Sequence, residues 1–192
     1  MANIVALDFE STGLLKADTD DPTQQPGIVE IGVVKRISNT SNIEWFNFQK
    51  LIDPETHFED EAQKISGITA AETYGKPNFR EVFMDFAQFV LGADYLFTFN
   101  GSGFDIPLLQ FNLRRYGLET RFPWPPIQYD IMKCAFNVTN MQGKTGNKYP
   151  KLIELYTSFF GEEFTNQHRA LEDAQATMKC GLHMIEKGYI QI

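Results

Sequence analysis

The chain has 192 residues, of which 43% are hydrophobic and 17 are phenylalanine. This length and composition suit one globular domain with a substantial core, and they exclude an intrinsically disordered protein. Seventeen basic and 25 acidic residues give a formal charge of −8, which argues against a polybasic binder of nucleic acid. The charge does not exclude a nucleic-acid enzyme whose metal ions supply the positive field. We expect a single domain over residues 1–192.

Neither the N-terminus nor the cysteines point to an exported protein. Residues 1–9, "MANIVALDF", run directly into a predicted strand without a basic region or a cleavage site, so we expect no signal peptide. No apolar stretch approaches the roughly 20 residues of a membrane span. Cys134 and Cys180 form no CxxC pair, and the three histidines show no zinc-site spacing. We expect reduced, buried thiols and a cytoplasmic protein with no membrane partner.

The predicted elements begin with strands. Runs rich in β-branched and aromatic residues, bounded by polar turn residues, predict strands over 4–10, 28–37 and 44–52. Residues 38–42, "SNTSN", are typical of a hairpin connection. Residues 14–27, "LLKADTDDPTQQPG", predict a long, polar, flexible loop. These three strands form the antiparallel part of the expected sheet.

Helical patterns then alternate with short strands. The predicted ranges are, in order, helix 79–91, strand 95–99, helix 105–117, strand 127–130, helix about 150–160 and helix about 170–187. Residues 138–149, "VTNMQGKTGNKY", predict a mobile loop. Three strands followed by βα units predict an α/β fold with a central mixed sheet of about five strands. The first three strands are antiparallel, and helices flank both faces of the sheet.

The first strand ends in two carboxylates, Asp8 and Glu10. Alternation places both on the same strand face, while Val5, Leu7 and Phe9 on the other face indicate an inner strand. Two like charges this close repel, so one takes up a proton unless a cation lies between them. The alternative is an exposed acidic strand end, which is the commoner interpretation of an isolated DxE pattern.

The next candidate carboxylate follows a later strand, in "FTFNGSGFDIP", residues 97–107. Asn100 ends that strand, two glycines allow a tight turn, and Asp105 begins a helix with Pro107 in its first turn. An Asp at this place is a good N-cap, worth about 1 kcal/mol. The junction of a strand end and a helix start is equally where open α/β sheets bind ligands. Both interpretations of Asp105 stay open.

"HRALEDA", residues 168–174, supplies a histidine and a fourth carboxylate. Five residues of a helix turn through about 140°. His168 and Asp173 therefore reach one site only if His168 lies in the turn before the helix and Asp173 on its first turns. The polar residues 161–167 permit such a turn. Taken alone, a histidine before a helix is more often a surface residue.

Together, Asp8, Glu10, Asp105, Asp173 and His168 suit a site for two divalent ions. Mg²⁺ and Mn²⁺ take oxygen ligands, and two such ions clamp the attacking and leaving oxygens of a phosphoryl displacement. An imidazole with an ordinary pKa of about 6.5 removes a proton from water at neutral pH. The pattern predicts two Mg²⁺ or Mn²⁺ ions and a histidine base.

The order "DFE", "NGSGFD", "HRALED" resembles the three motifs of the DnaQ-like (DEDDh) 3′–5′ exonucleases, a branch of the ribonuclease H-like fold. The resemblance covers nearly the whole chain. Residues 28–34 are similar to the family's second strand, 61–69 to its segment near the terminal base, and 151–155 to the helix before its third motif. The loops 15–27 and 138–149 are longer than in the family pattern.

This resemblance implies a role for each motif residue. The implied metal-binding and catalytic residues are Asp8, Glu10, Asp105 and Asp173, with His168 as the general base. The backbone amides near Thr12 and Gly13 and the side chain of Leu14 are implied to contact the 3′ nucleotide. Asn100 resembles the asparagine of the second motif, and Phe104 is an aromatic suited to hold the terminal base. Glu30 is a candidate support residue behind these groups.

We therefore expect a metal-dependent 3′–5′ exonuclease that hydrolyses terminal phosphodiesters of DNA, preferably single-stranded, to nucleoside 5′-monophosphates. Its partner is nucleic acid with a free 3′ end, which leaves room for a replication or repair partner. The alternatives are a 3′–5′ exoribonuclease acting on short RNA and a non-catalytic nucleic-acid-binding module. The complete set of five catalytic-type residues argues against the binding module.

Overall fold

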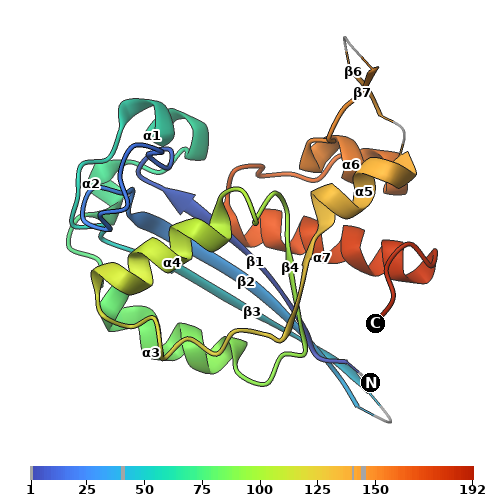
Figure 1. Ribbon diagram of the computed structural model, residues 1–192, viewed down its shortest axis with the longest axis horizontal. Coiled ribbons are helices and arrows are strands. Elements are labelled where there is room, and N and C mark those ends of the chain that lie inside the picture. Colours follow the sequence, from blue (N-terminus) through green and yellow to red (C-terminus); the bar gives the residue numbers. More distant parts are fainter. Residues whose placement is uncertain (1, 40–41, 140, 144–145) are drawn as a thin grey trace.

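A computed structural model describes residues 2–39, 42–139, 141–143 and 146–192, without the side chain of Asn137. Its centre is a five-stranded sheet with strand order β3-β2-β1-β4-β5, covered by helices on both faces (Figure 1). The strands are β1 Ile4–Ser11, β2 Ile28–Ser38, β3 Ile43–Leu51, β4 Tyr95–Thr98 and β5 Ile127–Asp130. Each lies within two residues of its predicted range.

The pairing of the strands confirms the predicted mixed sheet. β1 pairs antiparallel with β2, and β2 pairs antiparallel with β3. β4 pairs parallel with β1, and β5 pairs parallel with β4. Of the predicted hairpin connection 38–42, residues 40–41 lie outside the described residues.

Seven helices lie in the described part of the chain. They are α1 Asp60–Ser66, α2 Ala70–Thr73, α3 Phe79–Val90, α4 Asp105–Arg115, α5 Ile131–Thr139, α6 Leu152–Phe160 and α7 Ala170–Glu186. α3, α4, α6 and α7 match predicted helices, whereas α1, α2 and α5 were not predicted. α1 and α2 are too short to show a helical period. In α5, Ile131, Cys134, Ala135 and Val138 follow the i, i+3, i+4, i+7 spacing of a helix, a signal that the prediction missed. None of these described helices has both the length and the apolar character needed to cross a bilayer.

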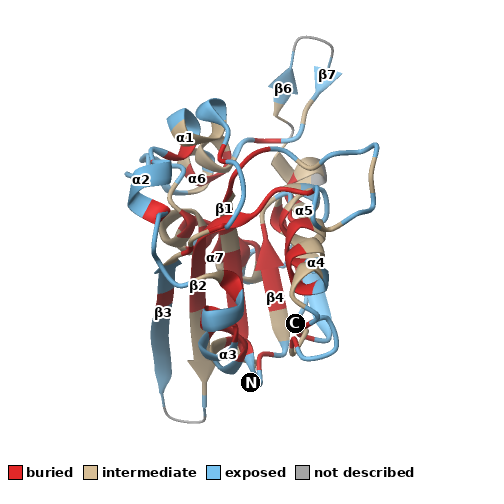
Figure 2. Ribbon diagram, turned by 90° about the vertical axis from the view of Figure 1, so that its left-hand side faces the viewer, coloured by how far each residue is buried: buried red, intermediate tan, exposed pale blue. Residues whose placement is uncertain are grey.

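The alternation of β1 divides the core into two. Its odd-numbered residues from Val5 to Phe9 pack against α3 and α4, whereas Ile4 and Ala6 pack on the other face with α5, α6 and α7. Figure 2 shows the central strands buried between these two layers. Asp8 and Glu10 continue the even-numbered set, so both point to the face that α7 covers.

α3 illustrates how local sequence sets these helices. Its N-cap Asn78 accepts the Glu81 N–H at 3.1 Å, and the Glu81 carboxylate accepts the Asn78 N–H at 2.7 Å, which forms a capping box. The predicted apolar stripe packs into the core. Its buried members are Phe79, Val82, Phe83, Phe86 and Val90, and Phe89 is half-buried.

The long loop between β1 and β2 is tied to the body of the protein by buried and charged side chains. The side-chain nitrogen of the buried Gln25 donates to the carbonyls of Lys16 and Thr19 at 2.8 and 2.6 Å. Arg115 of α4 donates to the carbonyls of Pro22 and Gln25. This irregular segment therefore has fixed anchors beside the end of β1.

The segment 138–149, predicted as a mobile loop, contains regular elements that the sequence analysis did not predict. α5 overlaps its start, and two short strands, β6 Gln142–Gly143 and β7 Gly146–Asn147, pair antiparallel. Figure 1 shows these strands projecting from the molecule beyond α5 and α6. Residues 140 and 144–145 of this segment lie outside the described residues.

The two cysteines differ in burial. Cys180 on α7 is buried, and Cys134 on α5 is half-buried; both are free thiols. The prediction of two buried thiols is therefore wrong for Cys134, because its helix packs near the surface edge of the sheet.

Candidate active site

Asp8 and Glu10 lie half-buried at the carboxyl end of β1. A carboxylate oxygen of each lies within 4.8 Å of the other and of one from Asp173 on α7. Gly32 of β2 is paired with Asp8, and a Cβ at this glycine would overlap the backbone of Ala170. The glycine therefore lets the start of α7 lie directly on β2, which brings Asp173 to the β1 carboxylates.

Asp105 reaches the same end of the sheet as the first residue of α4. Its side chain is buried, and its Oδ1 accepts the N–H of Phe9 at 3.2 Å. The N-cap of α4 is Phe104, without a side-chain cap bond. Of the two interpretations open from sequence, the N-cap role is therefore wrong, because the carboxylate bonds to β1.

The turn between β4 and α4 is held by Asp130 at the end of β5. Its Oδ1 accepts the N–H of Asn100 at 3.0 Å, and its Oδ2 accepts the Ser102 hydroxyl at 2.6 Å. Asn100 has a φ of 59°, and a Cβ at Gly101 would overlap the Thr98 side chain. Sequence reasoning missed Asp130. A carboxylate ending a strand of a βα unit was the available signal.

His168 lies in the turn before α7, as the spacing predicted. Its φ is 63°, in the left-handed region that is uncommon for a residue other than glycine. Its N–H donates to Asp173 Oδ2 at 3.1 Å, and Asp173 lies in the first turn of α7. The side chain of His168 is exposed. The predicted placement of this pair is confirmed.

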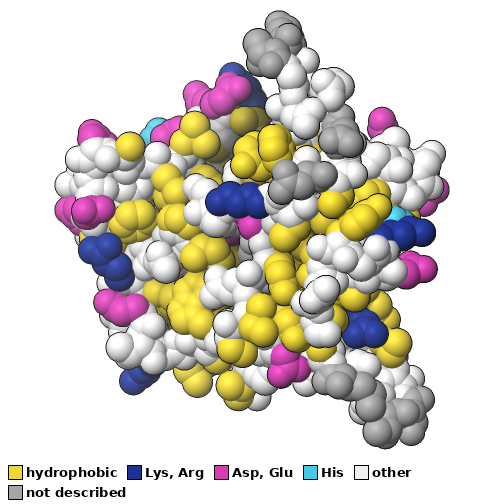
Figure 3. All heavy atoms as spheres, turned by 45° about the vertical axis from the view of Figure 1, so that its right-hand side comes forward, with side chains coloured by type: hydrophobic (Ala, Val, Ile, Leu, Met, Phe, Trp, Pro, Cys, Tyr) yellow, Lys and Arg dark blue, Asp and Glu magenta, His cyan; other side chains and the backbone are white. Residues whose placement is uncertain are grey.

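Most of these groups line one cleft of about 560 Å³; Glu10 and Asp130 are not among its described lining residues. The candidate residues on its walls are Asp8, Asn100, Phe104, Asp105, His168 and Asp173. Lys151, the N-cap of α6, also lines it and is the one Lys or Arg among the described lining residues. Sequence reasoning had assigned no role to Lys151. Lys151 adds a local positive charge to this cleft. Figure 3 shows a face of the molecule on which Lys and Arg side chains are scattered among hydrophobic ones.

A second cavity of about 270 Å³ adjoins the cleft. It is lined by Glu10, Gly13, Leu14, Glu59 and Phe104, among others. Leu14 is 77% exposed, which leaves this large apolar side chain free to pack against a bound group. Phe104 lines both cavities. The two cavities thus meet at an aromatic ring beside the carboxylates.

Thr12 lines neither of these two cavities. It is buried, and its N–H donates to the Gly27 carbonyl at 2.9 Å. Its hydroxyl accepts the Gly27 N–H at 2.9 Å, and its carbonyl accepts the Glu59 N–H at 2.9 Å. Through these hydrogen bonds Thr12 stabilises the turn that contains Gly13 and Leu14.

Burial and mutual repulsion raise the pKa of all four carboxyls. Burial, and next the charge of Asp105, raises the pKa of Asp8 well above its ordinary value. Burial raises the pKa of Glu10 to about 8, with the charge of Asp173 adding to it. Burial likewise raises the pKa of Asp105 to about 7 and that of Asp173 to about 6. Such a cluster is stable in its charged form only when a cation offsets the repulsion.

This donor set fits a hard divalent cation. The three groups within 4.8 Å of one another, from Asp8, Glu10 and Asp173, are all carboxylates. Mg²⁺ and Mn²⁺ bind such oxygens and leave positions for water and substrate phosphate, whereas softer ions prefer thiolates and imidazoles.

We expect the metal-free protein to lose stability as the pH rises from 5 to 8. Unfolded Asp and Glu titrate at about 4, whereas Glu10, Asp105 and Asp173 titrate at about 8, 7 and 6 in the fold. The folded state thus binds more protons in this window, so raising the pH lowers the free energy of unfolding. The check is the thermal midpoint in excess chelator at pH 5 and 8. Glu10→Gln should flatten the slope, and an unchanged slope in that variant would contradict the assignment.

The sequence profile of the RNase T exonuclease family matches residues 5–180. The chain belongs to this exonuclease family. The match extends from β1 into α7 and contains every candidate catalytic residue. The predicted DnaQ-like resemblance and the predicted class, an exonuclease acting on nucleic acids, are confirmed. DnaQ-like exonucleases need divalent metal ions, in agreement with the acidic cluster.

Two curated relatives are parts of DNA polymerase III. The chain is 26% identical over 183 residues to the PolC-type DNA polymerase III of Caldanaerobacter subterraneus subsp. tengcongensis, covering 95% of this chain and 12% of that protein. It is 35% identical over 109 residues to the DNA polymerase III subunit epsilon of Rickettsia prowazekii, covering 57% of this chain and 43% of that protein. The chain therefore spans less than half the length of these relatives.

Solved structures of exonucleases share the fold. Exonuclease I of E. coli in complex with a dT13 oligonucleotide superposes with a TM-score of 0.74 at 16% identity, covering 97% of this chain and 41% of that one. A 3′-exonuclease solved for 3′-end-specific recognition of a histone mRNA stem-loop gives a TM-score of 0.71 at 21% identity, covering 97% and 83%. The ribonuclease H-like fold class predicted from the sequence is confirmed.

Proposed function

We propose that the protein is a 3′–5′ exonuclease that releases nucleoside 5′-monophosphates, with residues 1–192 acting as one exonuclease domain. The observation that carries this proposal is the approach of the Asp8, Glu10 and Asp173 carboxylates within 4.8 Å. Asp8 and Asp173 line one cleft with His168, and Glu10 lines the cavity that adjoins it. An apolar cavity beside that cleft supplies a place for a terminal base. An acidic cluster without such a cavity would suit metal binding alone.

Asp8, Glu10, Asp105 and Asp173 would hold two Mg²⁺ or Mn²⁺ ions. When bound, divalent ions of this kind supply the positive field that stabilises the attacking and leaving oxygens of a phosphodiester. The protein's own task is to keep the four carboxylates charged and in place. The Phe9 amide does this for Asp105, and the His168 amide does it for Asp173.

His168 is proposed as the general base. Its backbone N–H donates to the Asp173 carboxylate. Its exposed side chain lies in the cleft beside the carboxylates. A neutral imidazole in this place can accept the proton of the attacking water. The leaving 3′ oxygen then takes a proton from solvent, which reaches the cleft freely.

The adjoining cavity is proposed to hold the unstacked terminal base. Leu14 and Phe104 supply apolar contact, and Gly13 lines the same cavity, where its lack of a Cβ accommodates the Glu59 carboxylate. Base stacking of this kind contributes about 1–3 kcal/mol and tolerates any sequence. A paired end must fray before it enters, so single-stranded ends should be preferred. Asn100, on the wall of the cleft, would contact the same end of the strand.

DNA is the proposed polymer, because the two relatives described above are parts of DNA polymerases. Those relatives also support a replication or repair setting, with nucleic acid bearing a free 3′ end as the immediate partner. One observation favours RNA as a second candidate. The Glu59 carboxylate lies against Gly13 in the base cavity, where it could accept a hydrogen bond from a ribose 2′-hydroxyl.

The test uses 5′-labelled DNA and RNA oligonucleotides of one sequence. We expect a ladder shortened from the 3′ end, mononucleotides from the first turnover, and faster decay of DNA. A 3′-phosphate should block digestion because the site accepts a free terminus, whereas a 5′-phosphate should have no effect. Cleavage of circular single-stranded DNA at a comparable rate would contradict the proposal, and Glu59→Gln slowing RNA alone would favour the second candidate.

A further inference from the structure

Glu30 of β2 is a fully buried carboxylate beside the candidate site. Its side chain is 0% exposed, and it lies opposite Glu10 in the β1–β2 pairing. It lines neither the cleft nor the adjoining cavity. A buried charge is costly unless it is paired and hydrogen-bonded. The partners of Glu30 therefore show what this carboxylate does.

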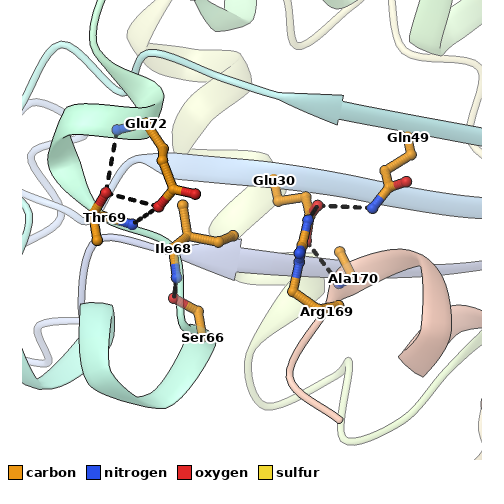
Figure 4. Close-up of polar contacts among 8 residues, drawn as sticks. All are labelled: Glu30, Gln49, Ser66, Ile68, Thr69, Glu72, Arg169 and Ala170. Carbon is orange, nitrogen blue, oxygen red and sulfur yellow. Dashed lines mark hydrogen bonds and ion pairs between the residues drawn. The ribbon is translucent and has the colours of Figure 1, made fainter. Parts of the chain in front are cut away.

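Among the described residues, the Glu30 carboxylate accepts four hydrogen bonds, and three of them come from the start of α7 (Figure 4). Its Oε1 accepts from Arg169 at 2.7 Å and from Gln49 of β3 at 2.9 Å. Its Oε2 accepts from the Arg169 Nε at 3.1 Å and from the Ala170 N–H at 3.0 Å. The Arg169 fork is bidentate, and the Ala170 bond satisfies one of the free N–H groups at the beginning of a helix. Glu30 thus caps α7 from a neighbouring strand.

The residues held by Glu30 directly follow His168 in the chain. His168 and Asn166 both have positive φ, 63° and 57°, conformations that cost free energy and persist only when surrounding contacts fix them. Arg169, the N-cap of α7, makes no side-chain cap bond of its own. The backbone on the helix side of His168 is therefore fixed by Glu30.

We infer that Glu30 is a positioning residue that, through Arg169 and Ala170, sets the place of His168 and Asp173 relative to the β1 carboxylates. This inference rests on the proposed function, since it names what keeps that site assembled. β2 pairs with β1 in the sheet, and the Glu30 side chain of β2 binds the start of α7. The strand thereby connects the first motif to the third.

The test is Glu30→Gln in the full chain. An amide keeps one acceptor oxygen but presents an NH₂ group to the Arg169 and Ala170 donors. The hydrogen bonds that hold the start of α7 to β2 are therefore weakened. Groups that orient metal ligands typically contribute about 10- to 100-fold to metal affinity or activity. We expect a kcat loss in that range with little change in KM, because the base cavity is untouched. Affinity of the substrate-free protein for Mn²⁺, read by EPR of free Mn²⁺, should also fall, since Asp173 moves with α7.

Lys35 provides a matched control on the same strand. Its ammonium donates to the carbonyls of Phe89 and Leu91 at 2.9 and 2.7 Å, at the end of α3 and away from the cleft. Lys35→Met should lower the thermal midpoint and leave kcat and Mn²⁺ affinity unchanged. A kcat loss in Glu30→Gln no larger than in Lys35→Met would overturn the inference, because both variants would then report only stability.

Arg169 supplies the second arm of the experiment. If Glu30 acts through Arg169, then Arg169→Met, Glu30→Gln and the double variant should show similar kcat losses, whereas losses that multiply would refute the connection. If Glu30→Gln does not fold, Arg169→Lys replaces it as the test, because lysine keeps the positive charge but cannot make the bidentate contact with Glu30. A wild-type kcat in Arg169→Lys would overturn the inference. Failure of the proposed function is distinct, since wild-type protein would then release no nucleotides. The Mn²⁺ comparison still tests the position of Asp173 in that case.

Discussion

Asp8→Asn should lower nucleotide release at least about 10³-fold and, at the same time, stabilise the metal-free protein. Loss of charge stabilisation by a metal costs several kcal/mol, and each 1.36 kcal/mol is a factor of ten in rate. The stability gain arises because burial and the charge of Asp105 raise the pKa of Asp8 well above its ordinary value. The amide of asparagine removes a negative charge that burial and the neighbouring carboxylates destabilise in the metal-free protein. The two effects therefore have opposite signs.

The measurement pairs kcat at saturating Mg²⁺ with the thermal midpoint in excess chelator, both at pH 8. Asp85→Asn, which changes an exposed carboxylate on α3, is the matched control and should alter neither quantity. If Asp8→Asn instead has a lower thermal midpoint than the wild type in excess chelator, it loses activity because it unfolds. That result would contradict the interpretation of Asp8 as a metal ligand.

His168→Ala should lower kcat about 10²- to 10⁴-fold, the usual contribution of a general base, while the affinity for Mn²⁺ persists. All four carboxylates are kept, and the backbone N–H that donates to Asp173 is present in alanine as in histidine.

His168→Asn separates loss of the imidazole from backbone strain. Asn tolerates positive φ better than Ala, so equal losses in the two variants assign the effect to the side chain. His57→Ala, at an exposed histidine outside both cavities, is the control for general effects. Near-normal turnover in His168→Ala would make His168 a surface residue before a helix.

The sequence predicted the positions of candidate site residues correctly where those positions follow from the periodicity of a single strand or helix. Period-two alternation placed Asp8 and Glu10 on one face of β1, and helical geometry required His168 to precede the helix that carries Asp173. Both features are properties of single segments, and the structure confirms them. The order of the three motifs then restricted the fold to one family.

What the sequence did not predict depends on contacts between distant segments. Asp130 holds a turn thirty residues earlier in the chain, and no local pattern links the two. The backbone N–H of Thr12 donates to the Gly27 carbonyl across the loop, and the family pattern did not predict this hydrogen bond. The Arg169 fork on Glu30 joins residues 139 apart. This last pairing arises from the packing of α7 on β2.

Nucleotide release by metal-free protein, titrated with Mg²⁺, tests the central claim most directly. The claim is that the carboxylates at the end of β1, α4 and α7 work by holding divalent ions at a 3′ terminus. With a single-stranded oligonucleotide, we predict no release in excess chelator, and release of nucleoside 5′-monophosphates from the 3′ end once Mg²⁺ or Mn²⁺ is restored. Full activity in excess chelator would contradict the account.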